Sequence, residues 1–402
     1  MIRHTHSMQI PLRKDPLMKF TNGLRTLTTM GAVTALAIGL AGCSGMSDTG
    51  SGGQANPANE NCESVDKVTV VLQWLTQAQF AGYFAADDKG YYADQCLEVT
   101  IQEGGTNVVP NQVVASGNAE FGVSLLPRSL ASREEGADIK LISQIYQNNS
   151  YLQVAWADSG FTELADLKGT TLGAWGGGND LTLRAALAGS GINMDTDVNV
   201  VQQPFDMSLL LNREADSVQA LTINEYAQLL ETVNPETGEL YTEDDFTMFN
   251  LQELGYNTLA DGVYAQGAWL EDEANQDIAA RFLAASYEGW AFCRDNAQEC
   301  VDIVLQRGSA LSATHQLWMM NEVNKLIWID NGTPIGTVNP DDFERTVQIA
   351  IDGGTLKAPA SESDVVDSSA HDAALKLLDA TGVDVIGAGF EPIEVTLTEG
   401  GK

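Results

Sequence analysis

Short runs of β-branched residues, each followed by a segment with helical periodicity, constrain this 402-residue chain more than any other feature. Residues 68–72 read Val-Thr-Val-Val-Leu, a composition typical of a strand that is covered on both faces. A helical pattern follows over residues 78–91, and a second strand is expected over residues 97–101. Because strand–helix–strand series build parallel sheets with right-handed crossovers, the sequence predicts an α/β fold.

A second series of this kind begins near residue 161, and the chain becomes mainly helical beyond residue 269. We therefore expect two lobes, each a mostly parallel sheet flanked by helices. A ligand would bind in the cleft between them, at the carboxyl ends of the strands. The expected division places residues 65–158 and 263–360 in the first lobe, residues 159–262 in the second lobe and residues 361–402 in a C-terminal tail.

The first 42 residues have the pattern of an export signal. Lys19 and Arg25 precede a short apolar run over residues 30–40, which is too short for the ~20 residues of a membrane span. The run ends in Leu-Ala-Gly-Cys43, which is typical of a bacterial lipid-attachment site. We expect a signal peptide over residues 1–42, a lipid on Cys43 and a flexible tether over residues 43–64, so that the protein is anchored on the outer face of the cytoplasmic membrane. The alternative is an ordinary secretory signal with an incidental cysteine.

The net charge of the chain is −34, from 21 Lys and Arg against 55 Asp and Glu. A field of this sign repels nucleic-acid phosphates, so the sequence excludes nucleic acid as a leading partner. The acidity itself does not identify a ligand. One hypothesis is that an acidic surface keeps the protein hydrated in a salt-rich habitat.

Four cysteines remain if Cys43 carries a lipid, and an exported protein can oxidise them. These are Cys62, Cys96, Cys293 and Cys300. Three pairings are possible. Proximity favours Cys293–Cys300, while Cys62 and Cys96 each precede a predicted strand and could be brought together by parallel neighbours. The chain has no Cys-x-x-Cys motif, and we expect no metal site.

Amide and aromatic side chains follow the predicted strands in both series. Such groups can stack on a flat ring and hydrogen-bond its nitrogens and carbonyls. The candidate ligand-binding residues at these strand ends are Trp74, Gln77, Phe80, Gly105, Ser124, Trp175, Gly177, Asn179, Asn224, Glu225 and Tyr226. The alternatives are core packing for the aromatic residues, a tight turn for the glycines and a helix cap for residues 224–226.

The sequence offers little support for catalysis. It has no Gly-x-Ser-x-Gly elbow and no plausible pair of a histidine and a nucleophile. Asp206 or Glu225 could serve as an acid or base, but no partner specifies that role, and Asp206 joins the candidate ligand-binding set. We expect a binding protein that is not an enzyme and needs no cofactor.

Several motifs resemble the substrate-binding proteins of ABC importers in the thiamine-pyrimidine-synthesis-like family. They are Leu-Gln-Trp at residues 72–74, Gln-Ala-Gln-Phe-Ala-Gly-Tyr at 77–83, Ala-Asp-Leu-Lys-Gly at 165–169 and Asn-Glu-Tyr-Ala-Gln at 224–228, and the likeness spans residues 68–357. The resemblance implies a periplasmic-binding fold of type II that acts as a monomer. It would deliver a small heterocycle to a membrane permease and its ATPase.

The family's ligands are thiamine pyrimidine precursors, such as hydroxymethylpyrimidine and formylaminopyrimidine, or riboflavin. The resemblance implies stacking roles for Trp74 and Tyr83, and polar contacts from Gln77, Asn179, Asn224 and Glu225. An anion such as a sulfonate or nitrate is a less favoured alternative, because the chain has few cations. A second alternative is a pyrimidine synthase like the fungal enzymes of the family, which look to carry a cysteine-rich iron motif and a sacrificial histidine. Residues 65–158 of the expected first lobe contain no histidine, and the four cysteines are scattered.

Overall fold

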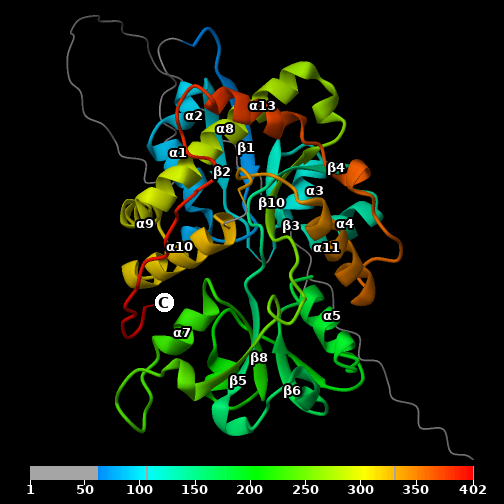
Figure 1. Ribbon diagram of the computed structural model, residues 1–402, viewed down its shortest axis with the longest axis vertical. Helices are drawn as coiled ribbons and strands as arrows, with labels where there is room; N and C mark the ends of the chain where they lie inside the picture. Colours follow the sequence, from blue (N-terminus) through cyan, green and yellow to red (C-terminus); the bar gives the residue numbers. More distant parts are fainter. Residues whose placement is uncertain (1–61, 106, 177, 330–331, 402) are drawn as a thin grey trace, which may run out of the picture. The chain divides into compact units, whose positions relative to one another are not determined.

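A computed structural model describes residues 62–105, 107–176, 178–329 and 332–401, all within one compact unit. The predicted signal peptide, Cys43 and nearly all of the predicted tether lie outside these residues, as does Gly177. Two five-stranded sheets, each flanked by helices, form two lobes (Figure 1). The prediction of a two-lobed α/β architecture is confirmed.

The sheet of the first lobe has the strand order β2-β1-β3-β10-β4. Its strands are β1 (Asp66–Val71), β2 (Leu97–Gln102), β3 (Phe121–Leu125), β4 (Ile139–Gln144) and β10 (Asp261–Gln266). β1 is parallel to β2 and β3, with Val68 opposite Val99, whereas β10 is antiparallel to both β3 and β4. One strand of this sheet is therefore reversed.

The sheet of the second lobe repeats this plan, with the order β7-β6-β8-β5-β9. Its strands are β5 (Tyr151–Trp156), β6 (Thr171–Ala174), β7 (Asn199–Gln202), β8 (Ser217–Leu221) and β9 (Phe246–Asn250). β5 is antiparallel to β8 and β9. The reversed strand in each lobe, β5 or β10, is thus the one that follows a crossing from the other lobe.

The positions of β5 and β10 correct the expected lobe boundaries. Residues 152–156 were assigned to the first lobe, but β5 pairs only with strands of the second sheet. Conversely, β10 begins at Asp261, two residues inside the expected second lobe. The two crossings therefore lie near residues 145–150 and 251–260. All six residues of β5 are buried, so its apolar composition suits the interior of either sheet and does not reveal its partners.

Helices cover both faces of each sheet. Those of the first lobe are α1 (Ala81–Asp88), α2 (Tyr91–Asp94), α3 (Pro110–Ala115), α4 (Leu126–Glu134), α8 (Glu273–Asp295), α9 (Ala297–Gln306), α10 (Ala313–Ile327), α11 (Pro340–Asp352), α12 (Glu362–Val365) and α13 (Ser369–Leu378). The second lobe has α5 (Leu181–Gly189), α6 (Ser208–Leu211) and α7 (Glu225–Leu230). Short 3₁₀ turns are η1 (Ala78–Phe80), η2 (Ala157–Ser159), η3 (Leu164–Leu167), η4 (Glu243–Asp245) and η5 (Trp269–Glu271).

The core of the first lobe forms where α1 meets the long helix α8. A Cβ atom at Gly289 would overlap the carbonyl oxygen of Gly82, and one at Gly82 would overlap the ring of Trp290. Only glycine permits this close approach of two helix backbones. Trp290 is 1% exposed and packs edge-on against Tyr83. This packing places Tyr83 inside the lobe.

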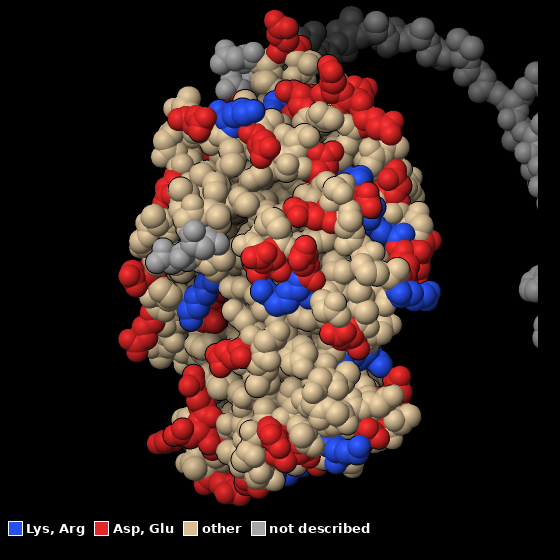
Figure 2. Space-filling model, turned by 45° about the vertical axis from the view of Figure 1, so that its right-hand side comes forward, with Lys and Arg blue, Asp and Glu red and all other residues tan. Residues whose placement is uncertain are grey.

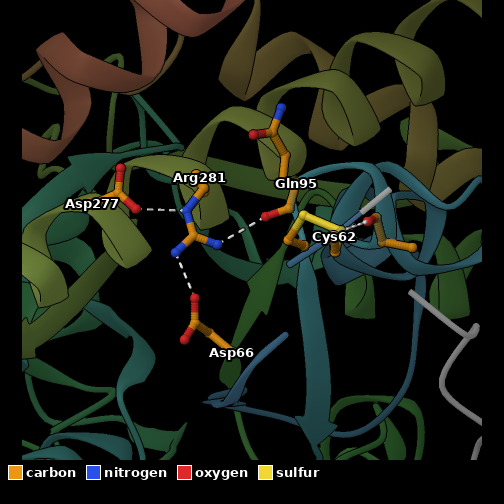
Figure 3. Close-up of a disulfide and its surroundings, with 7 residues drawn as sticks. Cys62, Asp66, Gln95, Asp277 and Arg281 are labelled. Atoms are coloured by element: carbon orange, nitrogen blue, oxygen red, sulfur yellow. Dashed lines mark hydrogen bonds and ion pairs between the residues drawn. A yellow bond between two sulfur atoms is a disulfide. The ribbon is translucent and has the colours of Figure 1, made fainter. Parts of the chain in front are cut away.

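Both favoured disulfides are present, Cys62–Cys96 and Cys293–Cys300. The first joins the segments that lead into β1 and β2. Beside it, Arg281 of α8 donates to Asp66 at 2.7 Å, to Asp277 at 2.8 Å and to the carbonyl oxygen of Gln95 at 2.9 Å (Figure 3). The start of the sheet is thereby fastened to the longest helix.

The residues assigned to a C-terminal tail are largely part of the first lobe, which corrects that expectation. α13 packs against α8, and the backbone N–H of Ile335 donates to Val385 at 2.8 Å. The end of the described chain lies beside α10 and α7 (Figure 1). There the N–H of Ser312 donates to Gly401 at 2.8 Å, and the N–H of Gly400 donates to Glu231 of the second lobe at 3.1 Å.

Acidic side chains outnumber lysines and arginines on the face shown in Figure 2, over both lobes. No helix in the described residues is both long and apolar enough to span a membrane. Within the same residues, no group of three or more histidine, cysteine, aspartate or glutamate side chains could hold a metal ion.

Candidate functional site: a polar pocket between the lobes

A cavity of about 80 Å³, which we call the inner pocket, lies between the two lobes. Its wall is built from the last residues of β3 and β8, from segments that follow β1, β6, β7 and β8, and from both crossings. The lining residues are Gln73, Trp74, Gln77, Gln79, Leu125, Tyr146, Asn149, Ser150, Tyr151, Trp175, Asn179, Phe205, Leu221, Ile223, Asn224, Glu225, Ala260 and Asp261. The ends of strands from both sheets therefore meet at one site, as expected for such folds.

A buried carboxyl group with amide neighbours forms the first-lobe wall of the pocket. Asp261, the first residue of β10, accepts hydrogen bonds from the Nε2 atoms of Gln73 and Gln79, the latter at 2.9 Å. Gln77 in turn donates to Gln79 Oε1 at 2.7 Å. Burial raises the pKa of Asp261 to about 7, although the hydrogen bond from Gln79 opposes this shift. Asp261 therefore changes its charge near neutral pH.

A second buried carboxyl group lies in the second-lobe wall. Glu225 begins α7 and accepts hydrogen bonds from the backbone N–H of Leu221 at 3.1 Å and from Asn224 Nδ2 at 2.9 Å. Burial raises the pKa of Glu225 to about 7. The pocket thus presents one titratable carboxyl group from each lobe, and each can accept hydrogen bonds from a ligand when it is ionised.

A buried histidine connects the second wall to the first lobe. His315 of α10 lies 2.9 Å through Nε2 from Asn224 Oδ1 and 2.8 Å through Nδ1 from Glu231 Oε2. His315 is 0% exposed and Glu231 is 2% exposed. Both ring nitrogens face oxygen atoms, so the ring links Glu231 to Asn224. The arrangement orients the Asn224 amide so that its Nδ2 faces Glu225.

Aromatic side chains close the pocket across the two lobes. Trp74 follows β1, and Phe205 follows β7 of the other lobe. Their rings meet edge to face, with centroids 4.7 Å apart. Trp175, which follows β6, is held by hydrogen bonds from its backbone N–H to Gln219 at 2.8 Å and from Nε1 to Pro204 at 3.2 Å. Two tryptophans are therefore available to pack against a flat ligand.

A larger cavity of about 660 Å³ adjoins the inner pocket, and we call it the outer vestibule. The two share Gln73, Trp74, Trp175, Asn179 and Phe205 as wall residues. The vestibule is also lined by Gly105, Val108, Val109, Gln112, Arg128, Ala131, Ser132, Glu135, Gly176, Gly178, Leu181, Gln202 and Thr355. It extends over both lobes.

Arg128 of α4 lies at the boundary between the two cavities. Its Nη2 donates to Asn179 Oδ1 of the other lobe. Burial lowers the pKa of Arg128, while the charge of Asp261 opposes that shift. Among the described residues no carboxylate pairs with Arg128, and its Nε has no hydrogen-bond partner. A half-buried cation without a carboxylate favours a ligand that offers acceptor oxygens.

The structure brings six of the candidate residues to the inner pocket: Trp74, Gln77, Trp175, Asn179, Asn224 and Glu225. Gly105 lines the outer vestibule instead.

Other candidates lie away from both cavities. Phe80, Tyr83 and Ser124 are at most 1% exposed, in or beside the core of the first lobe. Tyr226 packs near Trp318 in the core, and Asp206 accepts a hydrogen bond from the N–H of Ser208 at the start of α6. An aromatic residue in a helical run has no sequence signal that separates a pocket wall from a core, which accounts for the placement of Phe80, Tyr83 and Tyr226.

Several residues that line the inner pocket are not among the candidates from the sequence. Asp261, Tyr146, Tyr151 and Phe205 line the pocket but were not proposed, and Gln79 entered only as part of a motif. Asp261 had a usable signal, because it is a charged residue directly before the apolar run Gly-Val-Tyr-Ala at 262–265. A carboxylate in a buried strand is costly without partners and therefore often marks a site.

Known proteins that are similar to this chain include binding proteins and enzymes. The family model described as NMT1/THI5 like matches residues 77–300. The riboflavin-binding protein RibY of Chloroflexus aurantiacus is 26% identical over 248 residues, covering 60% of this chain and 67% of that protein. The formylaminopyrimidine-binding protein of Halalkalibacterium halodurans is 23% identical over 248 residues, covering 60% and 71%. A 4-amino-5-hydroxymethyl-2-methylpyrimidine phosphate synthase of Uromyces fabae is 28% identical over 111 residues, covering 27% and 33%.

Solved structures agree on the fold. The periplasmic nitrate-binding protein of Synechocystis PCC 6803 superimposes with a TM-score of 0.58 at 14% identity, covering 80% of this chain and 91% of that one. A Candida albicans protein described as having the generic periplasmic binding protein fold gives a TM-score of 0.52 at 12% identity, covering 84% and 99%. At such identities the likeness concerns the fold, and it confirms the expected periplasmic-binding architecture.

Proposed function

The chain belongs to the NMT1/THI5-like family. From that premise we propose that it is the extracytoplasmic substrate-binding component of an ABC importer. It captures a small planar nitrogen heterocycle between its lobes and delivers it to a membrane permease. The ligand class is that of riboflavin and of the aminopyrimidine precursors of thiamine, for which two of the related proteins are named.

The observation that carries this proposal is the composition of the inner pocket. Trp74 and Trp175 offer flat apolar surfaces, while Asp261 and Glu225 approach from opposite lobes. A nitrogen heterocycle has two flat faces and an edge of ring nitrogens, amino groups or carbonyl groups. The tryptophans match the faces, and the carboxyl and amide groups match the edge. Groups from both lobes must meet the same ligand, so binding stabilises the closed arrangement of the lobes.

An anionic ligand of the sulfonate or nitrate kind fits the inner pocket less well. Asp261 and Glu225 both have a pKa of about 7, so each is partly ionised at neutral pH. Among the described residues that line the two cavities, Arg128 alone is a lysine or arginine, and it belongs to the vestibule. A small anion would therefore meet more negative than positive charge.

The proposal includes a place and partners for the protein. The signal pattern at residues 1–42 and the Cys43 site would anchor the folded lobes beside the permease, on the outer face of the cytoplasmic membrane. A monomer suffices, because the cleft is formed by the two lobes of one chain. The chain itself performs no chemical step in this function.

The decisive experiment is calorimetric titration of the purified protein with riboflavin and with formylaminopyrimidine. We expect one of them to bind with a dissociation constant at or below the micromolar range. Mass and absorbance analysis of protein purified without denaturation adds an independent reading, because a flavin carried through purification is yellow. The absence of binding to either ring system, together with no co-purifying heterocycle, would refute the proposal.

The alternative is a pyrimidine synthase, which the similarity to the Uromyces fabae enzyme raises. That similarity covers only a third of the enzyme, whereas both binding proteins are covered over two thirds or more of their length. Incubation of the protein with iron and pyridoxal phosphate separates the two functions. We expect no new pyrimidine, and its formation would establish the enzyme.

A further inference from the structure

The outer vestibule is much larger than the inner pocket that it adjoins. Its volume is about 660 Å³, against about 80 Å³ for the inner pocket. The edge-to-face contact of Trp74 with Phe205 lies in the wall common to both cavities. A ligand held in the inner pocket therefore has a second space directly beside it, across an aromatic boundary.

The lining of the vestibule combines apolar side chains, such as Val108 and Leu181, with uncharged polar ones. Gln112 of α3 and Ser132 of α4 come from the first lobe, and Gln202 at the end of β7 comes from the second lobe. Amides and hydroxyls both donate and accept hydrogen bonds. Groups of this kind suit a ligand part that also donates and accepts, which is the chemistry of hydroxyl groups.

The charges at the vestibule favour the same conclusion. Arg128 and Glu135 are the charged side chains among the described residues that line the vestibule, so the lining carries no net charge. The whole chain has a net charge of −34. A phosphate group would be repelled by this field, whereas an uncharged hydroxyl chain would not.

We infer that the outer vestibule is a second subsite, which binds a flexible polyhydroxylated chain attached to the ring in the inner pocket. This inference rests on the proposed function and narrows it. It favours a flavin that carries a sugar-alcohol chain over a bare aminopyrimidine, which would leave the vestibule to water. Arg128 and Asn179 lie where the ring and the chain would join, since both line the vestibule and Asn179 also lines the inner pocket.

The test compares two flavins that differ only in the chain. Riboflavin carries a ribityl chain, and lumiflavin has a methyl group at the same ring position. We expect calorimetry to give a dissociation constant for riboflavin at least about tenfold below that for lumiflavin, since several hydroxyl groups gain partners. Riboflavin phosphate should bind more weakly than riboflavin because its phosphate adds negative charge.

The double variant Gln112→Ala/Gln202→Ala tests whether the difference in affinity between riboflavin and lumiflavin arises in the vestibule. Both side chains are exposed, and one belongs to each lobe, so their loss should leave the fold intact. The variant should reduce the riboflavin preference to about threefold or less while the lumiflavin affinity stays unchanged. Gln298→Ala, an exposed glutamine of α9 outside both cavities, is the matched control and should leave both affinities unchanged.

Four results would overturn the inference. Equal affinities for the two flavins, or a preference unaltered in the double variant, would show that the vestibule does not hold the chain. Binding of formylaminopyrimidine without binding of either flavin would leave the proposed function standing and refute the second subsite. Failure of all these ligands to bind would refute the proposed function itself, and this inference with it.

Discussion

His315 Nε2 of α10 lies 2.9 Å from Asn224 Oδ1 of α7, so a buried hydrogen bond joins the first lobe to the wall of the pocket in the second. The same asparagine donates through Nδ2 to Glu225 at 2.9 Å. A first-lobe side chain thus determines which face of the asparagine amide meets the pocket carboxylate. The position of the first lobe is thereby coupled to the orientation of the Asn224 amide in the second-lobe wall of the pocket.

Replacing His315 should be strongly destabilising. His315→Ala would leave Glu231 Oε2 and Asn224 Oδ1 buried without this partner, and leaving a buried polar group unsatisfied costs about 1–3 kcal/mol. The free energy of unfolding in urea should fall by about that amount. His315→Gln retains an amide donor and should lose less. A loss below about 1 kcal/mol in His315→Ala would contradict the proposed role of this bond.

The two pocket carboxyl groups should make the ligand-free protein less stable as the pH rises. Burial raises the pKa of Glu225 and of Asp261 to about 7, against about 4 in an unfolded chain. The native state therefore holds these protons more tightly, and the stability that they contribute is complete below about pH 4 and lost as the pH rises through about 7. The loss is on the order of 3 kcal/mol for each group.

Unfolding curves between pH 4 and pH 8 measure this effect. Glu225→Gln and Asp261→Asn should each show a shallower decline than the unaltered protein. Glu253→Gln removes an exposed carboxylate instead, and its decline should parallel that of the unaltered protein. Parallel curves for all three variants would mean that neither pocket carboxyl group is protonated near neutrality.

Trp74→Ala should weaken ligand binding without unfolding the protein. The substitution removes the contact with Phe205 and one flat surface of the pocket, with stacking alone worth about 0.5–1.5 kcal/mol beyond the area buried. We expect the dissociation constant to rise about tenfold or more. Tyr83→Phe is the informative control, because Tyr83 is 1% exposed in the core and away from the pocket. Equal effects of the two substitutions on affinity would contradict the assignment.

The two disulfides should contribute unequally to stability. Cys62–Cys96 closes a separation of 34 residues, and Cys293–Cys300 closes a separation of 7. In the chain-entropy account the first is worth about 4 kcal/mol and the second about 2 kcal/mol. Denaturant unfolding of the two Cys→Ser double variants should therefore show the larger loss for Cys62 and Cys96. The reverse order would indicate that native-state packing outweighs loop closure.

Cys43 should carry the lipid that anchors the protein. Expression in a bacterial host fed with an alkyne-tagged fatty acid should label the protein and place it in the membrane fraction. Cys43→Ser should abolish the label and release the protein from that fraction, whereas Ser44→Ala should change neither. A label that persists in Cys43→Ser would refute the attachment site.

Much of the architecture could be predicted from local pattern. The β-branched run at residues 68–72 and the helical and β-branched segments after it predict alternating strands and helices, since hydrophobic periodicity depends on neighbouring residues. The membership of β5 in the second sheet was not predictable, because every residue of β5 is buried and suits either sheet. Only contacts distant in sequence, with β8 and β9, decide it.

The residues of the inner pocket also fall into a group that the sequence predicts and a group that it does not. Trp74, Gln77, Trp175, Asn179, Asn224 and Glu225 could be found because polar and aromatic residues at strand ends converge in an α/β fold. Phe80 and Tyr83 belong to the same motif but turn into the core with α1 and α8. Asp261 and His315 contact the other polar residues of the site only in the folded chain, because their partners Gln79 and Asn224 are far away in the sequence.

The sequence alone thus determined the fold class, the export signal pattern and the chemical character of the cleft, because composition and periodicity are local properties. The tertiary structure alone decided which aromatic residues line the inner pocket, which carboxyl groups share it and how the lobes are linked. These features depend on side chains far apart in the sequence being desolvated together, and the pKa values of about 7 for Asp261 and Glu225 are a result of that burial.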